Sequence, residues 1–428
     1  MSLPRRVVAD RRPILRHASI GGGGMAWSDV QALASNDWVK LVAVADVDPS
    51  RIGELRAAFP GVRVYRDWRV LLEQEAGEID SVNVSVPDHM HGPIAYSAMR
   101  MGKHCYCQKP LAHDVFETRA LTRVAREKGV VTQMGIQFHA FKSYRQAVAL
   151  IRAGVIGRIR EVHSWSSKLW GDRGPPPRPS DPVPSGLDWD LWLGVAAGRP
   201  YVEGHYHPTQ WRRRLDFGTG TLGDMACHIL DPVFEALGLS APLSVRSEGE
   251  APDQWNWPND SMVRFVFPGT PITAADRVPV FWYDGAANAP ADLRSQVGLP
   301  PQRTSEDVRK SVEQGSIFVG TDGMMYLPHP GAPQLFPAAR FAGFPMPAAQ
   351  QGHHWTEWAE ACLVVGKPSA NFDYAGPLSE AVLLGCIAIR FPRRTLLWDS
   401  VALRFEGFTE ADHFIRRRYR EGWRVRGL

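Results

Sequence analysis

The stretch LRHASIGGGGMA, residues 15–26, decides the first half of the fold. A strand-like run leads directly into four glycines, and helical spacing then continues to about Ala34. The turn fits the GxGxx[GA] pattern, in which glycines permit a tight turn and let a pyrophosphate approach the backbone, and a small third residue lets the helix pack closely. The N-terminus of that helix faces the phosphates. The pattern predicts a dinucleotide site at Gly21, Gly23, Gly24, Met25 and Ala26.

A second strand-like run, residues 40–45, ends at Asp46. This aspartate follows Gly21 by about 25 residues, where a carboxylate can accept hydrogen bonds from both ribose hydroxyls of an adenosine. A glycine turn that binds no nucleotide would need no such carboxylate. Because Asp46 repels a 2′-phosphate, the sequence favours NAD over NADP, although Arg51 keeps NADP open.

Strand-like runs alternate with helical segments up to about residue 135, which is typical of βαβ units around a parallel sheet. Shorter strands with turn signals follow and predict a mostly antiparallel second sheet. We expect an α/β protein with an N-terminal Rossmann domain, a doubly wound parallel sheet, over residues 1–138 and a C-terminal α/β domain over residues 139–428. The expected strands are 15–20, 40–45, 81–86, 104–107, 130–133, 159–165, 261–267, 278–283, 316–320, 323–326 and 395–398, and the helices include 115–128, 354–365 and 378–390.

The composition narrows the class of partner. The chain has 428 residues, 44% of them apolar and 22% charged, which is enough to bury a sizeable core. A net charge of +4 is too small for its length to bind nucleic acid non-specifically, so we expect a small-molecule partner and no nucleic acid. The arginine-rich run at residues 416–420 is interpreted as a solvated helix face.

Cysteine usage and apolar runs bear on the compartment. Five cysteines with no CxxC pair indicate neither a disulfide framework nor a cysteine zinc site, and they favour a reducing compartment. No apolar stretch of signal-peptide length follows Arg5 and Arg6. The longest apolar run, residues 381–389, is well short of the ~20 residues that a spanning helix needs. We therefore expect a cytoplasmic protein without a membrane segment.

Two further strand ends carry polar residues. Val86, Pro87, His89 and His91 follow one strand, at the edge where open α/β sheets bind ligands, so we expect them beside the cofactor. An HxH metal pair is the alternative, but no third and fourth ligand lies at convincing spacing, and we expect no metal. The next strand ends in Gln108 and Lys109, and a lysine there can hydrogen-bond a substrate hydroxyl.

In the second half, Asp224 and His228 are four residues apart and share one face of a predicted helix. An imidazole suits the removal of a hydroxyl proton at neutral pH, as oxidation of an alcohol to a carbonyl demands. The spacing fits a purely structural pair equally well. The proline-rich segment 171–186 is a long loop, interpreted either as a linker or as part of an active-site mouth.

The GGGGMA turn with Asp46, the VPDHMH cluster, the Lys109–Pro110 dipeptide and the Asp224/His228 pair, in this order, resemble the Gfo/Idh/MocA family of oxidoreductases over about residues 14–400. The resemblance implies a Rossmann domain, a C-terminal α/β domain with a large open sheet that often mediates oligomers, and NAD(P)-dependent redox chemistry on sugars and polyols. It also implies catalytic roles: His228 as acid/base, Lys109 acidifying the hydroxyl, and Asp224 positioning the sugar and the imidazole, the last two being exchangeable. Gln108 stands where the family usually has Glu, so a charge beside the cofactor is lost.

Substrate contacts are expected mainly from the second domain. Our leading hypothesis is hydride transfer between NAD and a secondary hydroxyl or ketone of a sugar or glycoside, by a homo-oligomer, dimer or tetramer. The alternative is a redox-neutral, NAD-dependent glycoside hydrolase that oxidises C3 transiently and eliminates the aglycone, with Tyr206 or His207 as a second base. A sugar sensor that keeps NAD structurally is the third hypothesis. The polar and aromatic residues expected around cofactor and carbohydrate are Gln137, His139, Tyr206, His207, Trp211 and Arg212.

Overall fold

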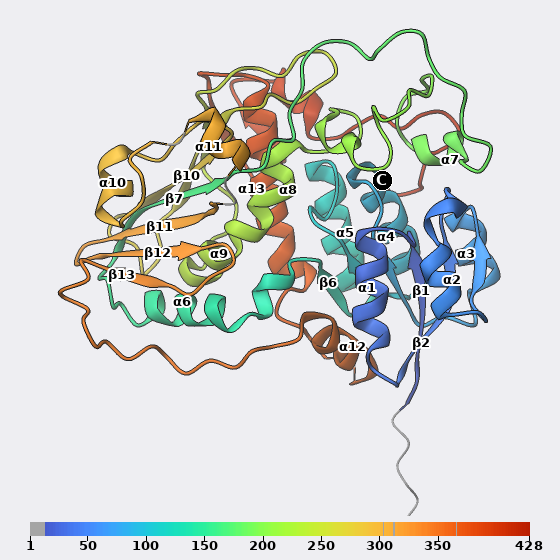
Figure 1. Ribbon diagram of the computed structural model, residues 1–428, viewed down its shortest axis with the longest axis horizontal. Coiled ribbons are helices and arrows are strands. Elements are labelled where there is room, and N and C mark those ends of the chain that lie inside the picture. The colour runs from blue at the N-terminus through green and yellow to red at the C-terminus, as the bar shows by residue number, and fades with distance from the viewer. Residues whose placement is uncertain (1–12, 303, 311–312, 365) are drawn as a thin grey trace, which may run out of the picture.

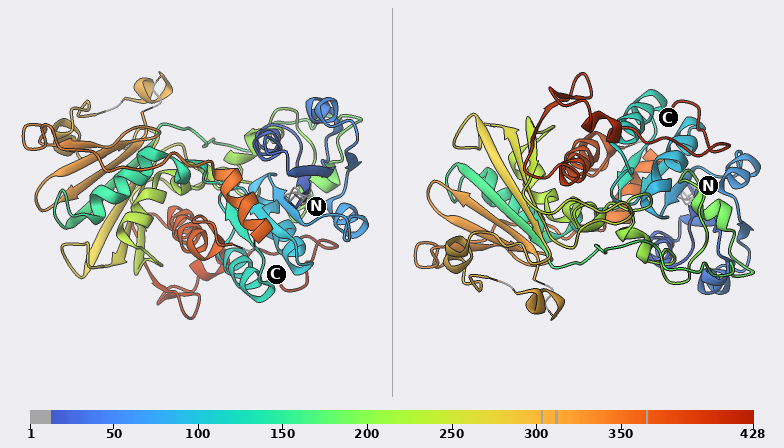
Figure 2. Two further views of the ribbon diagram at one scale, coloured as in Figure 1. Left: turned by 90° about the horizontal axis from the view of Figure 1, so that it is seen from below. Right: turned by 90° about the horizontal axis from the view of Figure 1, so that it is seen from above.

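The computed structural model describes residues 13–428 except 303, 311, 312 and 365, so Arg5 and Arg6 lie outside the described residues. Two sheets build the molecule, and they lie at opposite ends of it with helices between them (Figures 1 and 2). This confirms the expected α/β class.

The first sheet has six parallel strands in the order β3-β2-β1-β4-β5-β6. Its central strands are buried on both faces because helices cover both, as in a doubly wound fold. The shortest strand, β3, was not predicted; three residues are too few to show a period. The strands are β1 Leu15–Ile20, β2 Val39–Ala45, β3 Arg63–Tyr65, β4 Ser81–Val84, β5 His104–Cys107 and β6 Thr132–Met134.

Local sequence accounts for the helices around this sheet. The longest, α5, begins where the Asp114 side chain accepts a hydrogen bond from the Glu117 amide, and it ends at Gly129, whose φ of 61° is left-handed. The predicted bounds of α5 are confirmed. The helices of this half are α1 Met25–Ala34, α2 Gly53–Ala58, α3 Trp68–Gln74, α4 His91–Arg100 and α5 Val115–Lys128.

The second sheet has nine strands in the order β13-β12-β11-β7-β10-β9-β8-β14-β15, of which only the β7–β10 pair is parallel. Residues of β9 alternate between buried and more exposed, so one face of this strand is covered and the other is more open, whereas β11 and β12 are mostly buried on both faces. Its strands are β7 Ile159–Ser166, β8 Ser244–Ser247, β9 Ser261–Pro268, β10 Arg277–Asp284, β11 Gly315–Gly320, β12 Met324–Pro328, β13 Gln334–Phe336, β14 Thr395–Asp399 and β15 Arg404–Glu406.

The helix α13, Phe372–Ile389, starts six residues before its predicted start. Asn371 caps it by accepting a hydrogen bond from the Asp373 amide, and Pro377 is tolerated inside the helix. By length and composition α13 could cross a membrane, but 83% of it is buried inside the fold, as in a core helix. The other helices are α6 Lys142–Arg152, α7 Trp189–Leu193, α8 Gly220–Ile229, α9 Asp231–Leu237, α10 Ala291–Gln296, α11 Ser305–Lys310 and α12 His354–Val364.

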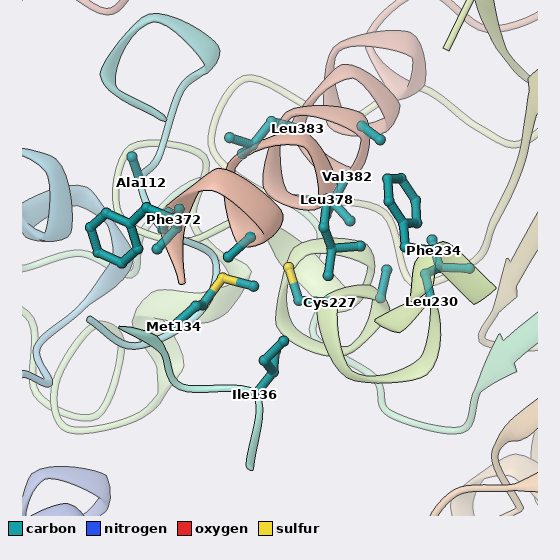
Figure 3. Packing of buried hydrophobic residues seen from close by; sticks show 14 of the residues in the cluster. Ala112, Met134, Ile136, Cys227, Leu230, Phe234, Phe372, Leu378, Val382 and Leu383 are labelled. Atoms are coloured by element: carbon teal, nitrogen blue, oxygen red, sulfur yellow. The ribbon is translucent and has the colours of Figure 1, made fainter. Parts of the chain in front are cut away.

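One apolar core runs through both halves of the molecule. In Figure 3, α13 packs at one end near Ala112 and Met134 of the first half, and further along it packs near Leu230, between α8 and α9, and Phe234 of α9. Burial of this continuous surface is the dominant stabilising contribution, at about 25 cal/mol per Å² of apolar area. The two sheets are therefore fixed relative to each other by a shared core.

Segments late in the chain return to the first sheet. The helix α12 buries Trp358 against Leu15 and Tyr106. The arginine-rich run 416–420 is not helical, which corrects the prediction of a helix face. It has no regular secondary structure, and it bonds to the start of α5: the Arg417 amide donates to Asp114 Oδ2 at 2.9 Å, and the Tyr419 hydroxyl donates to Glu117 Oε1 at 2.5 Å.

Candidate active site

A cavity of about 340 Å³ lies between the carboxyl-terminal edge of the first sheet and α8. It brings together residues that the sequence analysis took from four separate motifs. Its lining includes Gly21, Gly23, Gly24, Met25, Asp46, Val86, Pro87, His91, Gln108, Lys109, Gln137, His207, Trp211, Arg212, Asp224 and His228.

The glycine turn fits a pyrophosphate. Gly21 has a φ of 97°, and a Cβ there would lie 2.5 Å from the Ser85 carbonyl oxygen. A Cβ on Gly23 would lie 2.9 Å from the Arg51 carbonyl oxygen. The N-terminus of α1 has no side-chain cap and no acidic residue in its first turn, so its amides remain available to an anion. Ala26 is fully buried, as its predicted packing role requires.

Asp46 is held in place by backbone amides at the end of β2. Its Oδ2 accepts from the Gly22 amide at 2.8 Å, and its Oδ1 accepts from the Asp48 amide at 2.9 Å. Each carboxylate oxygen keeps a second lone pair for a ligand hydroxyl. Burial raises the pKa of Asp46 above its ordinary value, although the two amides oppose this effect. The carboxylate is thus positioned to accept from a ribose.

At the other end of the cavity, Lys109 and Asp224 form a buried ion pair. Lys109 Nζ donates to Asp224 Oδ1 at 2.7 Å and to the Asp224 carbonyl oxygen at 2.6 Å. The lysine follows β5 and the aspartate lies on α8, so the pair also joins the two halves of the chain. Side-chain exposures of 13% and 12% leave both groups accessible from the cavity.

Two more donors bind the same carboxylate. Trp170 Nε1 donates to Asp224 Oδ2 at 2.7 Å, and Arg212 Nε donates to Oδ1 at 3.1 Å. Burial alone would raise the pKa of Asp224, but Lys109 and Arg212 lower it below its ordinary value. Asp224 and His228 share a helix face as predicted, yet among the described residues Asp224 bonds to these cations and to Trp170, not to the imidazole. The expected role of Asp224 in positioning the sugar and the imidazole stays a prediction.

His228 is a buried, neutral imidazole at the cavity wall. Burial, followed by the Lys109 ammonium and His329, holds the pKa of His228 well below its ordinary value. The ring packs edge-on against Phe138 and stacks near His329, whose centroid is 5.9 Å away. Nδ1 is buried and has no hydrogen-bond partner within the described chain, which leaves Nε2 as the nitrogen that can face the cavity. A neutral imidazole in this position can accept a proton.

Gln108, where the resemblance leads one to expect Glu, has a carboxylate directly behind it. Its Nε2 donates to Asp29 Oδ2 at 2.9 Å. Asp29 lies on α1 and also accepts from Ser85 Oγ at 2.6 Å and Trp355 Nε1 at 2.9 Å. Burial raises the pKa of Asp29 to about 6, although these donors oppose the shift. The charge missing at position 108 is therefore supplied one hydrogen bond further from the cavity.

Besides Ala26, three predicted ligand-binding residues do not line the cavity. His89 is fully buried beside Trp192 and Phe217. His139 Nδ1 donates to Asp231 Oδ1 at 2.8 Å, and although burial lowers the pKa of His139, Asp231 raises it above its ordinary value. Tyr206 is 2% exposed in an aromatic cluster. Sequence position placed them near the site, but their side chains turn into the core instead.

The histidines at positions 89 and 91 do not converge on a common point. His91 bonds to the carbonyl oxygens of Pro110 and Val86 through its two ring nitrogens, at 2.7 and 2.8 Å. His89 Nε2 contacts the Trp192 carbonyl oxygen at 3.2 Å. Across the described residues no group of three or more His, Cys, Asp or Glu side chains could hold a metal ion.

His207 lines the cavity beside Asp48, and its assignment to the substrate stays a prediction. Its Nε2 lies 2.9 Å from Asp48 Oδ2, and its Nδ1 accepts from Trp192 Nε1 at 3.1 Å. Trp211, Arg212 and Gln137 also line the cavity. None of residues 171–186 is among its lining, so the proline-rich loop does not form its wall.

Several lining or supporting residues were not foreseen. Trp170 ends the strand-to-loop segment before the proline-rich loop, and Asp29 was hidden within α1; neither belongs to a motif. Asp88, inside the VPDHMH cluster, accepts from Thr219 Oγ1 at 2.7 Å and could have been found from its place in that cluster. The unforeseen cavity-lining residues include Arg66, Asp88, Leu191, Trp192, Pro208 and Thr209.

Two family models match the chain. One, described as an oxidoreductase family with an NAD-binding Rossmann fold, matches residues 15–136, and the other, the C-terminal alpha/beta domain of the same family, matches residues 159–265.

Curated relatives match over shorter stretches. A levoglucosan dehydrogenase of Pseudarthrobacter phenanthrenivorans is 26% identical over 188 residues, which are 44% of this chain and 40% of the relative. A dTDP-3,4-didehydro-2,6-dideoxy-alpha-D-glucose 3-reductase of Actinomadura kijaniata is 31% identical over 153 residues, 36% of this chain and 45% of the relative. The matched stretches thus span less than half the length of these relatives.

Solved structures share the fold along most of the chain. GenD2 from gentamicin A biosynthesis, in complex with NAD, superposes with a TM-score of 0.61 at 17% identity, covering 91% of this chain and 97% of that one. A levoglucosan dehydrogenase in complex with NADH and levoglucosan superposes with a TM-score of 0.58 at 19% identity, covering 88% and 97%. At such identities the likeness shows the fold. With more than half of its residues matched by the two family models, the chain belongs to the Gfo/Idh/MocA family of oxidoreductases.

Proposed function

We propose that the protein is an NAD-dependent oxidoreductase that transfers a hydride between the nicotinamide and a secondary hydroxyl or ketone of a carbohydrate. One observation carries the proposal: a single cavity joins the glycine turn and Asp46 to Lys109, Asp224 and His228. A dinucleotide held at the first group reaches toward the second, where a hydroxyl-bearing carbon is activated. A nicotinamide bound there supplies the hydride acceptor.

The chain's own residues handle the hydroxyl and its proton. His228, kept neutral by burial and by Lys109, accepts the hydroxyl proton as the carbonyl forms. Lys109 donates to the same oxygen and stabilises the charge that develops on it. Asp224 fixes the ammonium through its 2.7 Å contact and is itself held by Arg212 and Trp170. In the reducing direction each proton moves the opposite way.

The carbohydrate class rests on the lining and on the relatives. Trp211 can stack on a sugar face, and Arg212, whose guanidinium lies 4.2 Å from the Trp211 ring centroid, can donate to hydroxyls. A relative and a solved structure are both named as levoglucosan dehydrogenase, and a second relative is named as a deoxysugar reductase. These names support a sugar or sugar derivative as the substrate.

NAD is the proposed cofactor, with NADP as the less favoured one. Asp46 occupies the place where a 2′-phosphate would have to bind, while Arg51 and Arg66 line the same region. In competition assays we expect Asp46→Ala to raise the KM for NAD by about tenfold or more and to narrow the preference over NADP.

The test is to purify the protein, identify its bound nucleotide by absorbance and mass spectrometry, and assay free sugars and aryl glycosides. NADH accumulating with a free sugar, and lost in Lys109→Ala, supports the dehydrogenase. Aglycone released without net NADH would establish the redox-neutral hydrolase instead. The two residues suggested as a second base for that hydrolase do not favour it. Tyr206 is buried outside the cavity, and His207 lies against Asp48. Sugar binding without turnover would support the third hypothesis, a sugar sensor that keeps NAD structurally.

We also propose a division into domains at residue 138, a cytoplasmic location and a homo-oligomer. All five cysteines are free and buried, which supports a reducing compartment. The more exposed face of β9 supports self-association. Size-exclusion chromatography with light scattering tests the oligomer, and a monomer at micromolar concentration would contradict it.

A further inference from the structure

A second cavity, of about 320 Å³, shares no lining residue with the first. The last turns of α13, the start of α5, the segment before α8 and the arginine-rich run near Arg417 enclose it. One wall residue, Thr219, donates from its hydroxyl to Asp88 of the first cavity, so the two cavities lie back to back.

Arg417 brings unused donors to this cavity. Its Nε and Nη1 are buried and have no acceptor among the residues that the structure describes, while Nη2 donates to the Asp216 carbonyl oxygen at 3.2 Å. Buried guanidinium donors without an acceptor are destabilising, and proteins rarely leave them so. The geometry calls for an acceptor that is not part of the chain.

Arg390 is the second cation of the cavity. In the described structure its guanidinium has no hydrogen-bond acceptor and contacts only rings, 4.9 Å from the centroid of Trp257 and 4.5 Å from that of Phe414. Burial lowers the pKa of Arg390 to about 10, although Cys386 and Asp216 oppose this effect electrostatically. Both Arg417 and Arg390 lower the pKa of His113, after burial, which places them around one imidazole.

The acidic groups of the cavity are already engaged. Asp114 accepts from the backbone amides of Glu117 and Arg417, at 2.8 and 2.9 Å, and although it attracts Arg417 electrostatically it bonds to neither free donor. Asp216 pairs with Arg199. The two guanidiniums therefore keep donors that an added anion can satisfy.

We propose that this cavity is a binding site for a small organic anion, a carboxylate or a phosphate ester. The anionic group bridges Arg390 and Arg417, and the apolar body lies against Trp257, Leu383 and Ile387, which also line the cavity. Planar guanidinium forks suit both carboxylate and phosphate oxygens.

Isothermal titration calorimetry near neutral pH tests the site, with excess NAD present so that a probe does not occupy the glycine turn. Sodium benzoate and inorganic phosphate are the two probes, and the one that binds more tightly identifies the headgroup. We expect saturable 1:1 binding to the wild type, weakened about tenfold or more in Arg390→Gln and in Arg417→Gln. Arg394→Gln is the matched control, because Arg394 also stacks on a ring, 3.6 Å from the centroid of Phe408, but lies outside the cavity.

Saturable binding that survives unchanged in Arg390→Gln overturns the proposal, and so does the absence of saturable binding of both probes to the wild type. Far-UV circular dichroism and thermal unfolding verify that each variant is folded. If Arg417→Gln does not fold, the wild type, Arg390→Gln and Arg394→Gln decide the outcome alone.

Discussion

Two neighbouring residues at the end of β5 each hold a buried carboxylate, and they do so with opposite electrostatic results. Gln108 donates an amide hydrogen to Asp29, whose pKa burial raises to about 6. Lys109 donates to Asp224, whose pKa falls below its ordinary value because Lys109 and Arg212 overcome the effect of burial. Burial is common to both carboxylates. The charge of the partner decides whether a buried acid stays ionised.

The largest effect is expected when Lys109, the charged residue of this comparison, is replaced. In Lys109→Met the ammonium that contacts Asp224 and faces the substrate oxygen is lost, so kcat/KM should fall by about 10²–10⁴-fold. Steady-state kinetics with saturating NAD measure it. Lys128→Met, an exposed lysine at the end of α5, is the control, and equal activity of the two variants would refute the proposed role of Lys109.

Replacing Gln108 by the family's usual glutamate should turn its neutral contact with Asp29 into a pair of like charges. Gln108→Glu places a second carboxyl group against Asp29, so one of them must hold a proton, and above about pH 6 the variant should lose about 1–3 kcal/mol of unfolding free energy. Urea unfolding near pH 8 measures the loss. Gln74→Glu adds the same charge at an exposed position, and an equal loss in that control would show that proximity to Asp29 is irrelevant.

The two carboxylates should give opposite pH slopes. The folded-state pKa of Asp29 is raised, so its contribution to stability falls as pH rises from about 4 to about 6, by about 1–3 kcal/mol, and Asp29→Asn should remove this slope. The folded-state pKa of Asp224 is lowered, so its contribution is present above about pH 4 and is lost as pH falls below it. Asp224→Asn should remove that second slope. Unfolding curves across pH 3–7 would contradict the assignment if the slopes were exchanged.

The smallest effect concerns one donor behind Gln108. Trp355→Phe removes the indole hydrogen bond to Asp29 Oδ1 at 2.9 Å, which should raise the Asp29 pKa further and reduce the unfolding free energy by about 1 kcal/mol. Trp27→Phe, a half-buried tryptophan that packs on Phe59, controls for lost ring area. If both variants lost the same stability, the bond to Asp29 would contribute nothing.

Local sequence patterns predicted much of the fold. The strand 15–20, the strand 104–107 and the helix 115–128 match the structure residue for residue, because strong periodicity and capping residues mark their ends. The start of α13 was misplaced by six residues, because the helix begins after the Asn371 cap and continues through Pro377. The packing of α12 on the first sheet had no local signal at all, because it joins residues that are hundreds of positions apart.

The sequence predicted which residues lie at the ends of the strands, but not which way their side chains point. Parallel strands end at one edge, so Asp46, Gln108 and Lys109 could be brought together from sequence alone. Which way a side chain turns at that edge depends on packing, so His89 and Tyr206 were assigned to ligands although they lie in the core. The bond from Trp170 to Asp224 spans 54 positions, and no motif records it.

The return of α12 to the first sheet has a consequence for how the chain folds during synthesis. Leu15, Trp38 and Tyr106 are buried beneath Trp358, so the nucleotide-binding half lacks part of its cover until residues 354–364 have left the ribosome. Until then an apolar face of that half is exposed to solvent and to other nascent chains. Completion of the Rossmann half is thus delayed until most of the second half has been made, and truncations before residue 354 should aggregate or recruit chaperones.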